Sequence, residues 1–462
     1  MTATQSASKQ PPEAELQFDI GATDDSLERM AELFARHGDI YRVMSPTRKA
    51  YTYVIHHPDD VKRVLVSNHR NYTKGLGLDR VKILLGKGIM TSEGELWRRQ
   101  RYMMQPFFHR RVVTQFAATL DAVNERFTAR WDEYLRRGEL LNVTEEMSQL
   151  TLDIVLGSIF GRDLPELAPH FEVVTRESGR NLQFAFKFRS LTRVVAELIE
   201  RRRTGNEEHF DYVGMLMSAR DRESGKPMSE RELIDEIMTL VVAGHETTAS
   251  ALNWTWWLLS QYPEVEARLH AEVDAAPEFA GASLEQMESL QYTQQVINEA
   301  LRLYPPGWML SRRTIGADVL SGYDIPAATN ILLPLYLLHR HPRYWQDPER
   351  FWPERFAPDG EPGAPGTLRV AADNDAAAET TGADAGPLPA GPSKRPRFAY
   401  MPFAAGPRHC IGETLALYEM LIHLYKMARR YRLIYVPRQP LELEAQINLR
   451  TRYPLYMRLE RR

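Results

Sequence analysis

The single cysteine of the chain, Cys410, lies in a segment that could hold a metal-ligating thiolate. Phe403, Gly406 and Arg408 precede it, and Gly412 follows it just before an apolar helical run. A cysteine at a helix N-terminus meets free N–H groups and the positive end of the helix dipole, which stabilise a thiolate. The glycines allow a tight turn against a flat group, Phe403 can shield the sulfur, and Arg408 offers a cation to an anionic edge. This arrangement suits an axial ligand of haem iron.

Two other interpretations of Cys410 compete with the haem ligand. A lone intracellular cysteine is often only a small buried apolar residue. A nucleophilic cysteine needs a base beside it, and His409 is expected to point away from Cys410 at the start of a helix. The glycine and arginine spacing favours the haem ligand over both.

A second unusual group lies in the middle of a long predicted helix. Ser229 and Glu232 form a capping box ahead of an apolar periodic run that stops at Pro263. This helix would have about 33 residues and a length of roughly 50 Å, enough to cross a whole domain. A glycine and polar residues interrupt its apolar centre. Residues that break local rules in this way tend to mark functional sites.

The interruption is the sequence Ala-Gly-His-Glu-Thr at 243–247. The Thr247 hydroxyl can donate a hydrogen bond to the carbonyl of Ala243, four residues earlier, which opens a groove in the helix. Glu246 and Thr247 are therefore the predicted catalytic pair, and the alternative is a pair that only caps a kink. The segment begins an H-E-x-x-H motif, but Ala249 replaces the second histidine, which excludes zinc-protease chemistry.

Two further groups carry charge. Trp97 and Arg101 lie four residues apart on one face of a predicted helix, where both can reach a carboxylate. Glu299 and Arg302 lie three apart on another helix, and a link onward to Arg355 would make a buried charge network. Such a network specifies a fold more than it adds net stability, so we expect it to shape the pocket.

The elements that position these residues are mostly helical. Periodicity predicts a helix over 23–37, a hairpin of strands 40–44 and 50–55, a helix over 59–66, and helices through most of 92–294. Short strands return at 325–334 and in roughly the last thirty residues. The predicted architecture is a polar segment, 1–22, followed by one mainly helical domain with a small β portion, 23–462. Residues 358–396, rich in Ala, Gly, Pro and Asp, are predicted to be a flexible insertion.

The composition excludes several classes of protein. The 462 residues are 43% hydrophobic and 26% charged, as in a globular protein, and the net charge of −3 gives no field for nucleic acid. One cysteine excludes a disulfide framework and multi-cysteine zinc or iron–sulfur sites. The polar N-terminus has no signal-peptide pattern, and no run of about 18 apolar residues predicts a transmembrane anchor. We therefore expect a cytoplasmic protein.

Four motifs together resemble those of the cytochromes P450, the haem-thiolate monooxygenases. F-x-x-G-x-R-x-C-x-G at 403–412 is similar to the haem-binding signature, and A-G-x-E-T-T at 243–248 is similar to the oxygen-activation helix. Glu299-x-x-Arg302, with P-E-R-F at 353–356, resembles the ion-paired triad of the family. W-R-R-Q-R at 97–101 resembles the helix that holds the haem propionates. The similarity extends from about residue 24 to the C-terminus.

The resemblance implies the cytochrome P450 fold, with haem b between the long central helix and the cysteine loop. Cys410 would ligate the iron, and Glu246 and Thr247 would relay protons in a groove that holds dioxygen and water. Either Arg312 or Arg313 would contact a haem propionate. The remaining cofactor-binding residues implied are Trp97, Arg101, Ala243, Gly244, Phe403, Gly406, Arg408 and Gly412.

The implied activity inserts one oxygen atom from O2 into a hydrophobic organic substrate. The alternatives are an H2O2-driven peroxygenase and a non-catalytic haem-binding protein, and the intact Glu246-Thr247 pair disfavours both. Because no G-x-G-x-x-G motif occurs, we expect electrons from a separate ferredoxin- or flavodoxin-type donor with its reductase. An acidic donor would suit the cations Arg98, Arg99, Arg110, Arg111, Lys394, Arg395 and Arg397.

The resemblance also places a largely apolar substrate pocket at residues 75–90, 181–188, 241–243, 307–310 and 447–448. Fatty-acid-like substrates and terpenoid- or polyketide-like substrates both stay open. A fatty acid would need a cation for its carboxylate, and Lys74, Arg80 or Lys187 could provide one. The stretch 160–229 is short beside the usual pair of lid helices, which suggests a truncated or unusually open lid.

Overall fold

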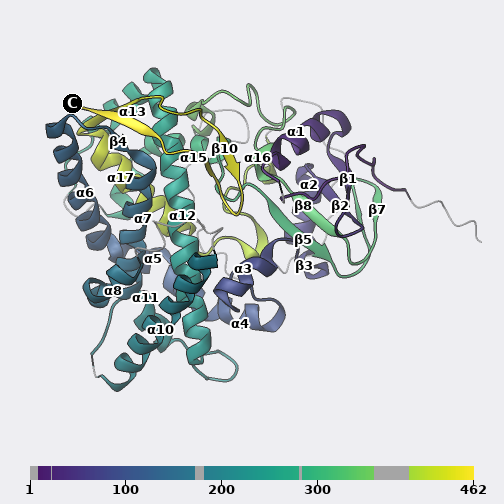
Figure 1. Ribbon diagram of the computed structural model, residues 1–462, viewed down its shortest axis with the longest axis horizontal. Helices are drawn as coiled ribbons and strands as arrows, with labels where there is room; N and C mark the ends of the chain where they lie inside the picture. Colours follow the sequence, from purple (N-terminus) through teal and green to yellow (C-terminus); the bar gives the residue numbers. More distant parts are fainter. Residues whose placement is uncertain (1–8, 22, 172–181, 206, 280–282, 358–394) are drawn as a thin grey trace, which may run out of the picture.

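The computed structural model describes residues 9–21, 23–171, 182–205, 207–279, 283–357 and 395–462. A large helical part and a smaller part built on a β-sheet lie side by side, and the long helix α12 (Glu230–Gln261) runs through the centre (Figure 1). The mainly helical fold with a small β portion is therefore confirmed. Most of the predicted insertion lies outside the described residues, as do residues 1–8 of the N-terminal segment.

Helix α12 begins and ends where its sequence signals predict. The Ser229 side chain accepts a hydrogen bond from the Glu232 N–H, and the Glu232 side chain bonds back to the Ser229 N–H, so the capping box is complete. The helix ends before Pro263, the first residue of α13 (Pro263–Ala275).

The other helices pack around α12. Helix α7 (Val143–Phe160) lies along it. Gly244 allows the two helices to approach closely, because a Cβ at this position would lie 2.9 Å from the Val155 side chain. The remaining helices of the helical part are α3 (Leu78–Leu85), α4 (Gly94–Met104), α5 (Arg110–Val113), α6 (Ala117–Arg137), α8 (Leu164–Phe171), α10 (Leu182–Thr204), α11 (Tyr212–Ser218), α14 (Leu284–Glu288), α15 (Gln291–Leu303) and α17 (Glu413–Ala428).

The β part is a five-stranded sheet in the order β1-β2-β8-β5-β3. Its strands are β1 (Ile40–Ser45), β2 (Ala50–Ile55), β3 (Tyr72–Lys74), β5 (Leu310–Thr314) and β8 (Asn330–Leu333). Strands β1 and β2 form the predicted antiparallel hairpin, whereas β2 and β8 are parallel. Short helices α1 (Ser26–His37), α2 (Pro58–Lys62) and α16 (Leu335–Leu338) accompany the sheet, and a π-helical turn, Arg63–Ser67, continues α2.

Three smaller sheets complete the fold. Strands β4 (Leu141–Asn142), β12 (Tyr456–Arg461) and β9 (Tyr431–Tyr435) form one sheet beside the helices. Strands β10 (Leu443–Ala445) and β11 (Leu449–Thr451) form a hairpin, as do β6 (Asp318–Leu320) and β7 (Tyr323–Ile325). The short strands expected at 325–334 and near the C-terminus are therefore present.

The segment before residue 23 is less separate than its polar composition suggests. The Ala14 N–H donates to the Arg42 carbonyl at 2.9 Å, which places this segment beside β1. Ala14, Phe18 and Ile20 are buried in an apolar cluster with residues of α1 and the sheet. These apolar side chains draw residues 12–20 onto the domain because burying them removes apolar surface from water.

The stretch 160–229 contains one long helix, α10, with the shorter α8 and α11 on either side in the sequence. Residues 172–181, which join α8 to α10, lie outside the described part of the chain. No helix within the described residues is long and apolar enough to cross a membrane.

Candidate active site

The loop before α17 holds Cys410 in place by backbone hydrogen bonds. The Cys410 N–H donates to the Phe403 carbonyl at 2.9 Å, which closes the loop. The N–H groups of Gly412 and Glu413 hydrogen-bond to the sulfur, as expected at a helix N-terminus. Burial raises the pKa of Cys410 to about 11 against the opposing effects of these donors and Arg101. The side chain nevertheless has exposed surface, so we infer that it faces a recess lined by protein.

The two glycines of this loop serve different purposes. Gly406 has φ +74°, and a Cβ there would lie 2.0 Å from the Leu65 carbonyl oxygen, so the loop can pass the Arg63–Ser67 turn only with glycine. A Cβ on Gly412 would meet nothing within 4 Å. Open space therefore lies against the backbone next to Cys410, where a flat group can approach.

His409 does not act as a base for the cysteine. Its Nε2 lies 3.2 Å from the Glu413 carboxylate, and burial lowers the pKa of His409 to about 4. Arg101 Nη1 donates to the His409 carbonyl at 2.9 Å. Arg101 therefore braces the cysteine loop, and a neutral His409 bonded to Glu413 agrees with a ligand rather than a nucleophile at Cys410.

The predicted ion network is fully formed and fully buried. Arg302 donates to Glu299 from Nε at 2.7 Å and from Nη2 at 2.8 Å, and Arg355 Nε donates to Glu299 at 2.9 Å. All three side chains have no exposed surface. Arg302 Nη1 also donates to the His339 carbonyl at 2.9 Å, and the His339 ring accepts the Met401 N–H at 3.1 Å. The network is thus connected to the segment that leads into the cysteine loop.

A cluster of cations lies near the same loop. Arg408 stacks on Trp97, with its guanidinium carbon 4.2 Å from the ring centroid, and its Nη2 pairs with Glu93. Burial and the charges of Arg408 and Arg312 lower the pKa of Lys74 to about 7. Burial and the Arg408 charge likewise lower the pKa of Arg312 to about 10. The cluster has more positive charge than Glu93 can balance, so it is suited to bind a group with carboxylates.

The structure separates the two candidate arginines of β5. Successive residues of a strand point to opposite faces of the sheet. Arg312 is directed to the cation cluster, whereas Arg313 is exposed. Arg312, and not Arg313, therefore belongs to the cation cluster.

The centre of α12 has the predicted back-bond. Thr247 Oγ1 donates to the Ala243 carbonyl at 2.8 Å, and Ala243 is exposed although α12 runs through the middle of the molecule. Glu246 turns to the β10–β11 hairpin, where Asn448 Nδ2 donates to its Oε2 at 2.9 Å. His245 points the opposite way and lies 2.9 Å from the Ser148 hydroxyl on α7. The acid and the alcohol therefore sit on the accessible side of the helix.

Three observations agree with a haem at this place. Cys410 offers a sulfur to a recess, Gly412 leaves open space beside it, and the cluster of Lys74, Arg312 and Arg408 needs anionic partners. A macrocycle with an iron centre and two propionates satisfies all three.

Sequence reasoning missed parts of this arrangement. Lys74 was one of three cations that could have met a substrate carboxylate, and its place within the cation cluster, with its ammonium donating to the Ile89 carbonyl at 3.4 Å and to the Met90 carbonyl, gave no signal in the sequence. Glu93 and the link between Asn448 and Glu246 gave no signal in the sequence, because their partners are far away along the chain. The sequence indicated Arg101 beside Trp97 at a carboxylate and gave no sign of its additional hydrogen bond to the His409 carbonyl in the cysteine loop.

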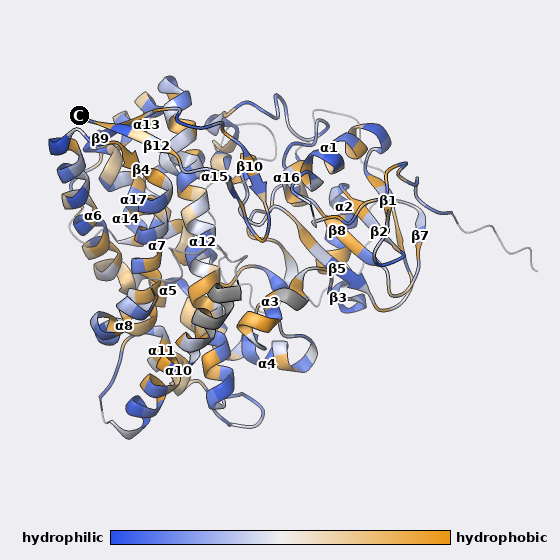
Figure 2. Ribbon diagram, viewed as in Figure 1, coloured by the Kyte–Doolittle hydropathy of each residue, from blue (hydrophilic) through white to orange (hydrophobic). Residues whose placement is uncertain are grey.

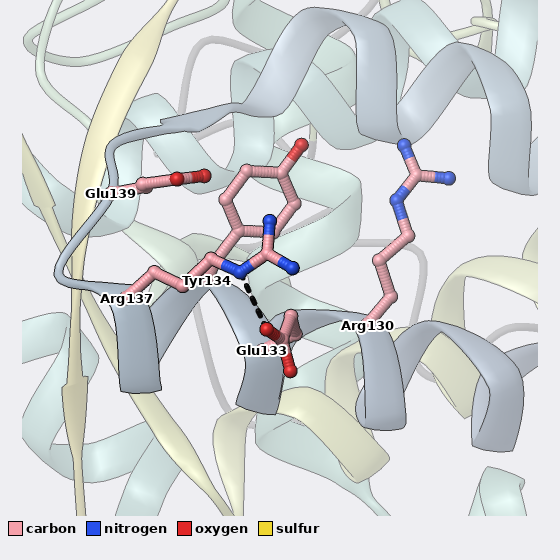
Figure 3. A pocket seen from close by; sticks show the side chains of 5 residues that line it. All are labelled: Arg130, Glu133, Tyr134, Arg137 and Glu139. Atoms are coloured by element: carbon pink, nitrogen blue, oxygen red, sulfur yellow. Dashed lines mark hydrogen bonds and ion pairs between the residues drawn. The ribbon is translucent and has the colours of Figure 1, made fainter.

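A shallow pocket lies apart from these residues, at the end of α6 (Figure 3). It is lined by Arg130, Glu133, Tyr134, Arg137 and Glu139, and the Arg137–Glu133 ion pair crosses it. None of the predicted site residues lines it, so it takes no part in the site described above.

Known proteins resemble this chain over almost its whole length. The sequence model of the family Cytochrome P450 matches residues 14–186 and 168–456. Cyclooctat-9-en-7-ol 5-monooxygenase of Streptomyces melanosporofaciens is 33% identical over 433 residues, which cover 89% of this chain and 86% of the relative. Pentalenene oxygenase of Streptomyces avermitilis is 29% identical over 433 residues, covering 89% and 87%.

The fold has a counterpart among solved structures. The crystal structure of the cytochrome P450DA heme domain superposes with a TM-score of 0.80 at 21% identity and covers 98% of each chain. The fold, the family match and the sequence relatives agree with one another. This chain therefore belongs to the cytochrome P450 family and is a haem-dependent monooxygenase.

Proposed function

We propose that this monooxygenase oxidises a cyclic, largely hydrocarbon substrate of the terpenoid type. Cyclooctat-9-en-7-ol and pentalenene, the compounds in the names of two relatives, support a substrate of this kind. The alternative that the sequence left open is a fatty-acid-like substrate with a carboxylate.

The position of Lys74 favours the hydrocarbon. Its ammonium is used by the backbone carbonyls of Ile89 and Met90 and lies among the cations of the haem cluster. A carboxylate that meets Lys74 there would be a haem propionate in the cation cluster rather than the carboxylate of a substrate chain. The side chains of Arg80 and Lys187 lie outside the described residues.

Apolar side chains next to α12 support the same proposal. Helix α3 is largely hydrophobic, in contrast to α6, which is mostly hydrophilic (Figure 2). Ile83 of α3 keeps 75% of its surface exposed, and Ile447 at the hairpin turn keeps 62%. Apolar surface of this kind suits a ligand held by burial rather than by charge.

The catalytic roles we propose rest on what the side chains can do. Haem iron, when bound, supplies the activation of dioxygen. Cys410 provides a sulfur whose position is fixed by the N–H groups of Gly412 and Glu413. Lys74, Arg312 and Arg408 would hold the haem propionates. Thr247 keeps its hydroxyl at the groove through the 2.8 Å bond to the Ala243 carbonyl, ready to donate or accept a proton there.

The observation that carries the proposal is this hydroxyl with Glu246 beside it on an accessible stretch of α12. A non-catalytic haem protein has no need for an acid and an alcohol at that place. H2O2 already carries the two electrons and two protons that O2 would need, so a peroxygenase depends less on proton delivery along α12. We therefore favour O2-dependent turnover over both alternatives.

Electrons would come from a separate ferredoxin- or flavodoxin-type protein with its reductase. Arg397 is exposed, and its positive charge lies close enough to His409 to lower the pKa of that histidine. A cation therefore lies on the cysteine side of the site. Arg98 and Arg111 are also exposed, whereas Arg395 is buried against Trp345 and drops out of the expected patch. Lys394 lies outside the described residues. The expected cytoplasmic location stays a prediction.

The thiolate is tested by the absorption spectrum of the reduced, carbon-monoxide-bound protein. We expect a strongly red-shifted Soret band in the wild type and its loss in Cys410→Ser, because only a thiolate ligand produces that shift. A red-shifted band that survives Cys410→Ser would overturn the assignment.

The substrate class is tested by titrating the oxidised holoprotein with pentalenene and, separately, with palmitate. We expect a substrate-type spin-state shift with the hydrocarbon at lower concentration than with the fatty acid. Lys74→Met should reduce haem retention rather than selectively weaken palmitate binding. A palmitate shift that is tighter than the pentalenene shift and depends on Lys74 would contradict the proposed substrate.

A further inference from the structure

The catalytic face of α12 continues into a stripe of polar side chains. Positions 246, 250 and 253 are spaced four and three residues apart, so they share one face of the helix. Each of them reaches the β10–β11 hairpin by a hydrogen bond. The bonds are Asn448 Nδ2 to Glu246 Oε2 at 2.9 Å, Ser250 Oγ to the Leu449 carbonyl at 2.5 Å, and Asn253 Nδ2 to Thr451 Oγ1 at 3.3 Å.

The hairpin turn that carries Asn448 is held from a second side. Trp308 Nε1 donates to the Gln446 carbonyl at 2.7 Å, and the Leu449 N–H donates to the Pro306 carbonyl at 2.9 Å. The residues before and after Asn448 are therefore fixed to the segment that precedes β5. This leaves the amide of Asn448 in a set position relative to α12.

The neighbouring ionisable groups are engaged elsewhere. On α12 itself, His245 faces α7, and burial lowers the pKa of His245 to about 4, so it is neutral. On the hairpin, Arg450 Nε donates to Glu444 at 2.6 Å. Among the described residues, the side-chain hydrogen bond recorded for Glu246 is the one from Asn448.

We propose that Asn448 is a positioning residue for the proton relay. A glutamate side chain has several accessible rotamers, and a fixed amide donor selects the one in which the carboxylate accepts its hydrogen bond. Asn448 thereby holds the Glu246 carboxylate beside the groove that Thr247 opens. Because Ile447, at the tip of the same turn, is exposed on the predicted substrate side, the hairpin joins the substrate pocket to the acid.

This inference rests on the proposed role of Glu246, so its test includes Glu246→Gln. The holoprotein is supplied with electrons by a plant-type ferredoxin and its NADPH-dependent reductase, with pentalenene as the probe. The quantity measured is the peroxide released per NADPH oxidised, which does not require that the probe is converted. We expect Asn448→Ala to raise this ratio roughly three- to tenfold, a factor that corresponds to the net free energy of one ordinary intramolecular hydrogen bond.

Ser250→Ala is the matched control, because it removes the neighbouring bond to the same hairpin and leaves Glu246 untouched. It should leave the peroxide ratio near the wild-type value while loosening the hairpin to a similar degree. An equal rise in Ser250→Ala and Asn448→Ala would show that only hairpin docking matters, and the positioning role would be rejected.

The double variant separates the two proposals. If Asn448 acts through Glu246, Asn448→Ala adds nothing in the Glu246→Gln background, whereas independent effects would multiply. A ratio unchanged in Glu246→Gln alone would refute the proton relay itself. A ratio raised in Glu246→Gln but not in Asn448→Ala would refute the positioning role alone.

A second readout distinguishes positioning from packing. Asn448→Asp keeps the size of the side chain but replaces the amide donor by a carboxylate, which cannot donate to Glu246 and repels it. Its peroxide ratio should therefore rise at least as far as that of Asn448→Ala, although the packing volume is kept. A wild-type ratio in Asn448→Asp would contradict the proposal.

Discussion

The buried network around Glu299 gives a prediction whose magnitude follows from the structure. Glu299 accepts three hydrogen bonds from two guanidinium groups, and the Trp352 N–H donates a fourth at 2.9 Å. Glu299→Gln keeps the shape but replaces one acceptor oxygen by an NH2 group that faces arginine donors. It also leaves two guanidinium charges uncompensated in a region with no exposed surface. Removing one partner of a buried ion pair costs about 3–5 kcal/mol.

The assay is urea unfolding of the holoprotein, followed by circular dichroism and by the Soret band. We expect the unfolding midpoint to fall by roughly 1 M, given the steep urea dependence of a chain of this size. The matched control is Arg137→Ala, which breaks an ion pair whose side chains are 59% and 34% exposed (Figure 3). An exposed pair contributes only about 0–1 kcal/mol, so this midpoint should barely move.

The network is also expected to affect the ligand. Arg302 holds the His339 carbonyl, and the His339 ring holds the Met401 N–H at the start of the cysteine loop. Glu299→Gln should therefore release haem at lower urea than that needed to lose helical signal. A midpoint shift no larger than that of Arg137→Ala, with haem loss and helix loss coincident, would refute the coupling argued here.

Three shorter predictions follow from single residues. Arg312→Ala should weaken haem retention about tenfold against apomyoglobin as a haem acceptor, and Arg313→Ala should leave it unchanged, because only Arg312 faces the cation cluster. Gly406→Ala should destabilise the fold by more than about 2 kcal/mol in urea unfolding, because its Cβ would lie 2.0 Å from the Leu65 carbonyl oxygen. Burial raises the pKa of Glu236 from 4.5 to about 8, so the folded state binds a proton that the unfolded chain loses, and wild-type stability falls as pH rises from about 5 to 8. Glu236→Gln should match the wild type in urea unfolding at pH 5 and exceed it by about 2–4 kcal/mol at pH 8, and an equal difference at both pH values would contradict this.

Local signals account for the features that the sequence predicted well. The capping box at Ser229 and the stop at Pro263 define α12 because each acts within one helical turn. The bond from Thr247 to the Ala243 carbonyl is likewise a contact four residues apart, and the Glu299–Arg302 pair is a contact three apart. The resemblance of the four motifs to those of the cytochromes P450 then indicated that these separate residues form one site.

Contacts between distant parts of the chain account for the features that the sequence could not give. The choice between Arg312 and Arg313 depends on which face of β5 meets the cation cluster. The need for glycine at 244 comes from Val155 on another helix, and the need for glycine at 406 comes from the Leu65 carbonyl. A helical or loop pattern shows that such a position is unusual, but only the packed chain shows what lies against it.

The two sides of the site are held by different kinds of interaction, and this difference has a consequence for specificity. The cysteine side is fixed by the fully buried Glu299 network and by backbone hydrogen bonds at Phe403 and Met401, which leave little room for movement. The substrate side consists of α12 and a hairpin joined by a few side-chain bonds, with Ile447 exposed at the turn. Substitutions around the hairpin can therefore alter which hydrocarbon fits without disturbing the sulfur ligand. They do so independently of proton delivery only where Asn448 keeps its hydrogen bond to Glu246, so a change of substrate specificity that displaces Asn448 should be accompanied by a change in peroxide release.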